Sequence, residues 1–191
     1  MEGEPPLIDR EMLRETVLVT TEKLRANPSG GIIRPYVETK LLRNVSAEAS
    51  WEQSGQVFSV RSDEAPGRGG AGEHPTAIRY FLSGISFCLA VWYAKSAALA
   101  DVQLDSFELR LEAGFDMRVE YGLSPAPGPE FVVSTARISS RASADAVREI
   151  AEEAHRRCPL ANLVARAVPI YFRVVHDGEG VLDTVPAELR I

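Results

Sequence analysis

The sequence has few of the residue types that build metal centres, disulfide frameworks or nucleic-acid surfaces. Its 191 residues include only two cysteines, Cys88 and Cys158, and three histidines, with no repeated pair of ligands at metal-binding spacing. The net charge is −6 at pH 7, and no basic run is longer than Arg156-Arg157. Nucleic-acid binders concentrate lysine and arginine on one surface. We therefore expect no metal, no cofactor and no nucleic-acid partner.

The chain also lacks the pattern of an export signal or a membrane span. Its first residues, MEGEPPLIDREML, are acidic and do not show a basic segment followed by an apolar one. The longest uncharged stretch in the apolar centre, 80–94, has fifteen residues, whereas a bilayer span needs about twenty. We therefore expect a cytoplasmic protein without membrane contact, in a reducing compartment where both cysteines remain thiols.

What the sequence does contain is an ordinary globular composition, with 45% hydrophobic and 25% charged residues. The hydrophobic pattern predicts helices over 7–26, 76–100, 143–157 and 160–167, and strands over 37–42, 44–51, 56–62, 104–121, 131–140 and 168–175. Gln53-Ser54-Gly55-Gln56 predicts a turn between two of these strands. Because strands and helices do not alternate as β-α units, the order predicts the α+β class.

The predicted helix over 76–100 is apolar on nearly every face, so we expect it to be the central buried helix. Pro75 suits its first turn, where a missing N–H costs nothing. The preceding segment, SDEAPGRGGAGEHPT, has four glycines, but their spacing matches neither a phosphate-binding loop nor a dinucleotide fingerprint. We read it as a connecting loop.

The two cysteines are the candidates for chemistry. Cys88 falls in the middle of the central helix, and Cys158 falls where Pro159 ends the helix over 143–157. Freed backbone groups at such a break can hydrogen-bond a thiolate. The alternative is that Cys88 is a small, inert core residue, as free cysteines in apolar helices usually are. His155, three residues before Cys158, adds a single pair of possible ligands and does not predict a metal site.

Four features in order resemble the OsmC/Ohr family of thiol-dependent peroxidases: a glycine-rich loop, a proline opening a long helix, a cysteine in mid-helix, and a second cysteine followed by proline. The strings GGAGEHPTAIRYFLSGISFCLAVWYA and EIAEEAHRRCPLANLV carry them. The resemblance covers roughly 35–176, and we divide the chain into an N-terminal helical extension, 1–34, and an OsmC-like domain, 35–191. It implies an intertwined homodimer, with six-stranded, antiparallel-rich sheets wrapped around two central helices and active sites at the subunit interface.

The resemblance also implies roles for particular residues. Cys88 would be the peroxidatic thiolate that attacks an organic hydroperoxide, Cys158 the resolving thiol, and an external thiol the reductant. Phe81, Phe87, Trp92 and Tyr93 would line a pocket for apolar peroxides, although aromatic residues in such a helix can equally be core.

One position departs from the family. A glutamate nine or ten residues before the reactive cysteine orients an arginine in relatives, and the residues here are Arg79 and Ile78. Nearby substitutes are Arg68 as the cation, with Glu73 or His74 to orient it. Two other functions stay open: a non-catalytic module that binds a small hydrophobic ligand, and an enzyme that uses the central cysteine as a nucleophile in another reaction.

Overall fold

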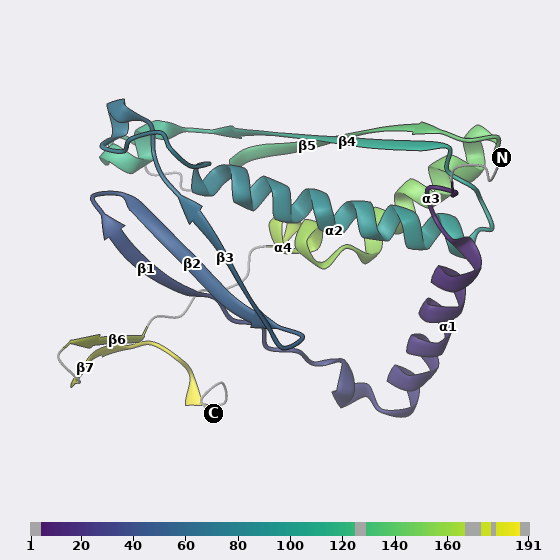
Figure 1. The fold of residues 1–191 in the computed structure, drawn as a ribbon, viewed down its shortest axis with the longest axis horizontal. Helices are drawn as coiled ribbons and strands as arrows, with labels where there is room; N and C mark the ends of the chain where they lie inside the picture. The colour runs from purple at the N-terminus through teal and green to yellow at the C-terminus, as the bar shows by residue number, and fades with distance from the viewer. Residues whose placement is uncertain (1–4, 125–128, 167–172, 177–178, 188–191) are drawn as a thin grey trace.

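The computed structural model describes residues 5–124, 129–166, 173–176 and 179–187 (Figure 1). The elements are, in chain order, α1 (Arg10–Ala26), η1 (Pro28–Gly31), β1 (Glu38–Arg43), β2 (Ser46–Gln53), β3 (Gln56–Ser62), η2 (Pro66–Arg68), α2 (Ala77–Leu99), β4 (Ser106–Phe115), η3 (Met117–Tyr121), β5 (Pro129–Ser139), α3 (Ala144–Arg157), α4 (Pro159–Ala165), β6 (Arg173–His176) and β7 (Glu179–Asp183). Helices and antiparallel strands occur without β-α alternation, so the predicted α+β class is confirmed.

The described strands form three antiparallel sheets, with orders β1-β2-β3, β4-β5 and β6-β7. The turn predicted at 53–56 is confirmed: Gln53 pairs with Gln56, and Ser54 and Gly55 between them have φ of 53° and 75°. Two positive φ angles define the hairpin turn whose twist matches that of its strands. The six-stranded sheets implied by the family resemblance stay a prediction, since the described strands of one chain group as three, two and two.

Helix α2 is the element on which the others assemble. It packs against α1, α3, α4 and β4, with β4 and β5 running alongside it (Figure 1). Ile85, Leu89, Tyr93 and Ala97 are four residues apart, so they share one face of the helix, and all four are buried. They form the main core together with Leu104, just before β4, with Ile150 and Ala154 on α3, and with Cys158 directly after α3.

The expectation that α2 is buried on nearly every face is wrong for this chain. Phe81, Phe87 and Val91 are exposed, to 40%, 71% and 50% of their surface. By length and composition α2 meets the criterion for a membrane span, a criterion that the core helix of a soluble protein also meets. Its apolar residues divide between a face buried in its own chain and an open face.

The predicted strand over 104–121 is too long at its C-terminal end, because β4 stops at Phe115. The Asp116 side chain accepts hydrogen bonds from the backbone N–H and the guanidinium of Arg118 and so begins the 3₁₀ turn η3. Gly122, at φ 68°, ends that turn. Local side-chain-to-backbone bonds therefore override the alternating pattern.

The helix starts also differ slightly from the prediction. Asp9 accepts a hydrogen bond from the Met12 N–H, so α1 begins at Arg10. Thr76 is the extended N-cap residue of α2, and Pro75 lies one residue outside the helix rather than in its first turn. Residues 168–172 of the predicted last strand lie outside the described part of the chain, and β6 confirms its final segment.

The β1-β2-β3 sheet presents apolar side chains that its own chain leaves open. Leu41 and Phe58, which share one face of the sheet, are exposed, and Trp51 stacks on Phe58 with ring centroids 6.1 Å apart. In Figure 1 this sheet extends away from α2, to which it is joined by the loop after β3. Antiparallel sheets normally bury one apolar face, and the described part of this chain leaves that face open.

Candidate functional site

The two cysteines, seventy positions apart in the sequence, meet where α3 ends against the middle of α2. The two thiols lie close enough for Cys88 to raise the pKa of Cys158, and Cys88 packs against the core cluster that contains Cys158. Both are free thiols. Cys158 is fully buried, whereas Cys88 is half-buried. The sequence placed both residues on separate helices, and the packing of α3 along α2 brings the sulfurs together.

The surroundings of the Cys158 thiol favour its protonated form. Burial, and then the hydrogen bond to Cys88, raise the pKa of the Cys158 thiol above its ordinary value. The backbone N–H groups of Ala161 and Leu160 act in the opposite direction. Negative charge on Cys88 raises this pKa further. The surroundings of Cys158 therefore favour its protonated thiol form.

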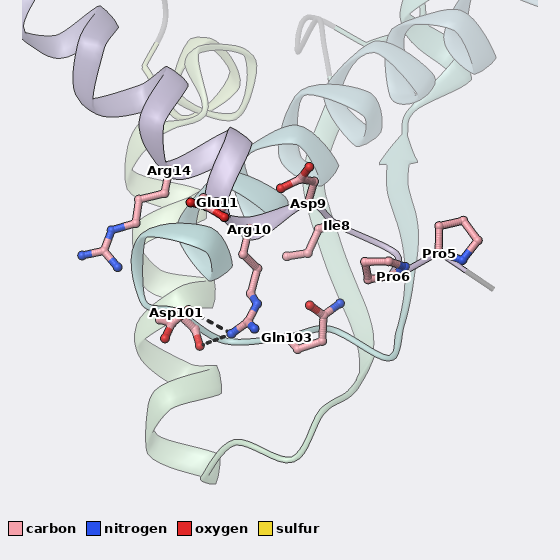
Figure 2. Close-up of a pocket in the computed structure, with 9 residues that line it drawn as sticks. All are labelled: Pro5, Pro6, Ile8, Asp9, Arg10, Glu11, Arg14, Asp101 and Gln103. Atoms are coloured by element: carbon pink, nitrogen blue, oxygen red, sulfur yellow. Dashed lines mark hydrogen bonds and ion pairs between the residues drawn. The ribbon is translucent and has the colours of Figure 1, made fainter. Parts of the chain in front are cut away.

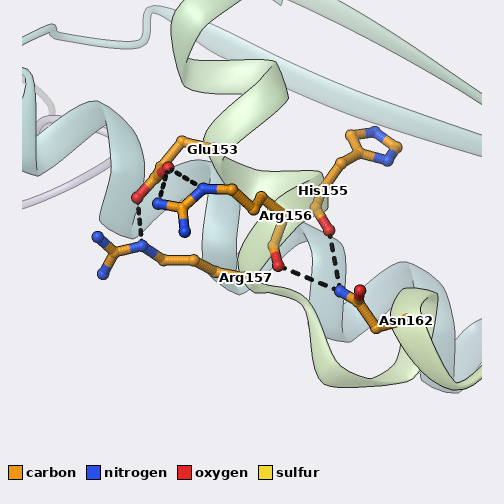
Figure 3. A network of polar contacts seen from close by, with 5 residues as sticks. All are labelled: Glu153, His155, Arg156, Arg157 and Asn162. Atoms are coloured by element: carbon orange, nitrogen blue, oxygen red, sulfur yellow. Dashed lines mark hydrogen bonds and ion pairs between the residues drawn. The ribbon is translucent and has the colours of Figure 1, made fainter.

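A sharp bend between α3 and α4 holds Cys158 in place, as predicted from Pro159. Cys158 closes α3 through its N–H to the Ala154 carbonyl, 3.0 Å. It also begins α4, where its Sγ accepts from the Ala161 N–H at 3.4 Å. The Asn162 amide reaches back across the bend to the carbonyls of residues 155 and 156 (Figure 3). It also donates to the carbonyl of Cys158. Sequence reasoning missed Asn162, because only the folded bend aims its side chain.

Two cations lie over Trp92, which is one helical turn after Cys88 on α2: Arg157 at the end of α3 and Lys95 on α2 itself. The Arg157 guanidinium lies 5.5 Å from the centre of the Trp92 ring, and the Lys95 ammonium lies 5.2 Å from it. Glu153 pairs with Arg157 and with the neighbouring Arg156 (Figure 3). Trp92, predicted to line a substrate pocket, is thus half-covered by two cations.

Apolar side chains line the open side of α2 next to Cys88. Phe81, Gly84, Cys88 and Val91 follow the three-and-four spacing of one helix face. A β-carbon at Gly84 would lie 3.8 Å from a methyl group of Leu160, so α4 adjoins this face directly. Phe87, Leu160 and Leu163 are exposed. The predicted substrate residues Phe81 and Phe87 therefore lie on an apolar surface beside the thiol pair, whereas Tyr93 belongs to the core.

The glycine-rich loop after β3 is folded around the buried carboxylate of Asp63. Asp63 accepts hydrogen bonds from the N–H groups of residues 64, 71 and 73, at 2.8, 3.0 and 3.2 Å. Burial alone would raise the pKa of the Asp63 carboxyl, but these N–H donors and that of Gly72 hold it below its usual value. The segment predicted as a connection is therefore a tightly built turn.

Arg68, predicted as an activating cation, pairs with two carboxylates, and neither is the predicted Glu73. Its guanidinium donates to Glu64 at 2.9 Å and to Glu120 of η3 at 2.5 Å. Among the described residues these replace Glu73, whose backbone N–H instead binds Asp63. Cys88 lies eleven residues into α2, roughly 16 Å from the end that adjoins this loop. Arg68 and Cys88 of one chain are therefore not brought together.

Other candidate groups lie away from the cysteines. His155 packs its ring edge-on to Tyr93, at 6.0 Å between centroids, instead of turning toward Cys158. In the part of the chain that the structure describes, no three metal-ligating side chains cluster. A polar cavity of about 680 Å³ lies between the first turn of α1 and the end of α2, beside the Arg10–Asp101 ion pair (Figure 2). It contains none of the predicted site residues.

The fold and the thiol pair define an α+β protein with a two-cysteine site between a long central helix and a bent helix pair. The family model described as OsmC-like protein matches residues 70–173, more than half of the chain. This chain therefore belongs to the OsmC-like family, as the sequence features predicted.

Solved structures of the same fold resemble the chain. An OsmC-like protein from Mycoplasma pneumoniae aligns with a TM-score of 0.58 and 16% identity, over 71% of this chain and 89% of its own. A proposed osmotic stress induced and detoxification response protein from Psychrobacter arcticus aligns with a TM-score of 0.54 and 11% identity, over 69% and 88%. No curated protein matches the sequence at a significant level. At such identities the likeness concerns the fold.

Proposed function

We propose that this protein is a thiol-dependent peroxidase that reduces organic hydroperoxides through Cys88 and Cys158. The observation that carries the proposal is the contact between the two sulfurs, with Cys88 the accessible partner and Cys158 the buried one. A peroxide reaches Cys88 first.

The reaction follows from these positions. The Cys88 thiolate attacks one oxygen of the hydroperoxide, an S–O bond forms, the O–O bond breaks, and the alcohol leaves after taking up a proton. Cys158 then attacks the sulfur of the resulting sulfenic acid, a disulfide forms, and water leaves. An external thiol reductant returns two electrons by thiol–disulfide exchange. Each step requires only the pair and a co-substrate.

The substrate class is proposed from the apolar surface beside the pair. Phe81, Phe87 and Val91 on α2 and Leu160 and Leu163 on α4 suit an alkyl or aryl hydroperoxide better than hydrogen peroxide. A monomeric protein rarely leaves such a patch open. We therefore propose that a homodimer covers part of it.

The homodimer also accounts for two other features. The exposed apolar residues of the β1-β2-β3 sheet would pack against an apolar face of a second copy of the chain. Arg68, which pairs with Glu64 and Glu120, lies in the loop before α2, and eleven residues of that helix separate the loop from Cys88. We therefore propose that Arg68 acts on the thiolate of the partner subunit. We place the protein in the cytoplasm, where thiol reductants are abundant, without a membrane or nucleic-acid partner.

The proposal is tested with reduced protein, cumene hydroperoxide and a dithiol. With the dithiol present, wild type is expected to consume peroxide continuously. Without it, the protein is expected to lose two free thiols per equivalent of peroxide, because both sulfurs enter the disulfide. Cys88→Ser removes the nucleophile at nearly constant volume and is expected to abolish consumption. Cys158→Ser keeps the first step and is expected to accumulate a sulfenic acid that a dimedone-type reagent traps. Equal consumption by wild type and Cys88→Ser would refute the proposal.

A further inference from the structure

We infer that Asn162 is a positioning residue for the Cys158 thiol, because its side chain supplies the hydrogen-bond donor that Pro159 removes from the chain. The geometric part of this inference concerns the bend alone. Its kinetic part rests on the proposed function, in which Cys158 resolves the oxidised Cys88.

The unsatisfied carbonyls come from the helix break. In an uninterrupted helix the carbonyl of residue i accepts from the N–H of residue i+4, so the His155 carbonyl would require an N–H at position 159. Pro159 has none. The extended backbone of Cys158, with φ −71° and ψ 112°, takes the chain out of the helix, so the Arg156 carbonyl also loses its helical partner.

Asn162 fills both gaps from the next helix. Its Nδ2 donates to the His155 carbonyl at 3.3 Å and to the Arg156 carbonyl at 3.2 Å. The same nitrogen donates to the Cys158 carbonyl at 2.8 Å, which also accepts from the Asn162 backbone N–H at 3.1 Å. One amide thus joins the last turn of α3 to the first turn of α4 across Cys158 (Figure 3).

The bend decides where the sulfur points. With its backbone held on both sides, Cys158 directs Sγ to the Ala161 N–H and to Cys88, out of contact with solvent. Asn162 touches neither sulfur and acts only through the backbone of Cys158. Its removal leaves the carbonyls of residues 155 and 156 to water, while the Cys158 carbonyl keeps its bond from the backbone N–H of residue 162. The bend thereby gains alternatives in which Sγ turns away from Cys88.

This role separates the two oxidative steps. Attack on the hydroperoxide needs only Cys88, and its rate is expected to be independent of Asn162. Disulfide formation requires the Cys158 sulfur to lie in line with the S–O bond of the sulfenic acid, from which water leaves as the S–S bond forms. Loss of Asn162 is therefore expected to slow the second step alone.

The first experiment does not depend on peroxidase activity. In a Cys88→Ser background, alkylation of Cys158 by iodoacetamide reports how often the buried thiol is released. Asn162→Ala is expected to increase this rate roughly tenfold, corresponding to the loss of one or two net hydrogen bonds. The matched control is Arg166→Ala, an exposed residue at the end of the same helix, which is expected to leave the rate unchanged. Equal rates for Asn162→Ala and its parent overturn the inference.

The second experiment tests the reason for the role. Pro159→Ala restores an N–H at position 159 and removes the steric bar to a helical Cys158, so the His155 carbonyl can be satisfied without the side-chain amide. In this background Asn162→Ala is expected to change Cys158 alkylation only about twofold, a non-additivity that shows shared function. If Asn162→Ala alone does not fold, the double variant is expected to regain folding. Additive effects, or no regain, contradict the proposed link with Pro159.

A third measurement joins the inference to catalysis. In single turnovers with both cysteines present, Asn162→Ala is expected to form the sulfenic acid at the wild-type rate and the disulfide roughly tenfold more slowly. If wild type does not react with cumene hydroperoxide, the proposed function fails, while the alkylation result still decides the geometric role. If wild type reacts and both of its steps keep their rates in the variant, the kinetic role of Asn162 fails.

Discussion

The glycine-rich loop yields a prediction whose size follows directly from the coordinates. A β-carbon at Gly70 would lie 1.9 Å from the Glu64 carbonyl oxygen, 2.5 Å from its carbon and 2.6 Å from an oxygen of Asp63. The obstructing atoms are mostly backbone, and no rotation of a flexible side chain relieves them. Gly70→Ala therefore has to move the loop by more than 1 Å and disturb the hydrogen bonds to Asp63.

Such overpacking costs about 3 kcal/mol at the upper end of its usual range. Gly67, three residues earlier in the same loop, is the matched control: a β-carbon there meets nothing within 4 Å, and its φ is not positive. Gly67→Ala is expected to be neutral or to stabilise the chain by about 0.5 kcal/mol, through the reduced freedom of the unfolded state.

The assay is urea denaturation of wild type and both variants, analysed by linear extrapolation. The two variants are expected to differ by at least 2 kcal/mol, or roughly 4–8 °C in Tm for a chain of this length. If Gly70→Ala is as stable as Gly67→Ala, the loop is not built around the Asp63 carboxylate as described, and the reasoning about it is refuted.

Three further predictions concern charge and association. The unfolded chain loses the Cys158 proton at lower pH than the folded chain does, so the free energy of unfolding is expected to fall above about pH 8.5. Cys158→Ser should reduce this fall in a plot of the urea midpoint against pH between 7 and 10. An unchanged slope contradicts the raised pKa. Asp63→Asn is expected to lower the urea midpoint at pH 7. The difference in midpoint from wild type should shrink below about pH 4, because proton uptake by this carboxyl then favours the unfolded wild type. A difference that does not change with pH would exclude charge as its cause. Phe87→Asp is expected to convert the proposed homodimer to monomer in sedimentation velocity, whereas Glu152→Ala, on an exposed part of α3, leaves it intact; a dimeric Phe87→Asp variant would place the interface elsewhere.

Much of the fold follows from local signals. The hairpin turn at Ser54-Gly55 and the helix break at Pro159 depend on conformations that neighbouring residues alone decide. The strand predicted through residue 121 failed where Asp116 bonds to nearby backbone, a competition that an alternating pattern does not reveal. The open face of α2 was missed because hydrophobicity reports what is apolar and does not report which apolar surface a single chain can cover.

The site was less accessible to sequence reasoning. The cysteines were identified because they are the only two and each falls on its own helix, but their contact depends on how α3 packs along α2. Arg68 was expected to have a carboxylate partner, yet Glu120 lies 52 residues away along the chain, and no local pattern links them. Asp63 and Asn162 act on backbone groups, so their roles arise only once the loop and the bend are folded.

The contact between Cys88 and Cys158 also bears on heat resistance. A disulfide between them closes a ring of roughly 70 residues that contains β4, β5 and α3, and in the chain-entropy model such a ring stabilises the folded state by about 4 kcal/mol. The oxidised protein would then melt at a higher temperature than the reduced one. A simple melting curve would thereby read out how far the pool of this protein has been consumed by its oxidant, without any probe attached to sulfur.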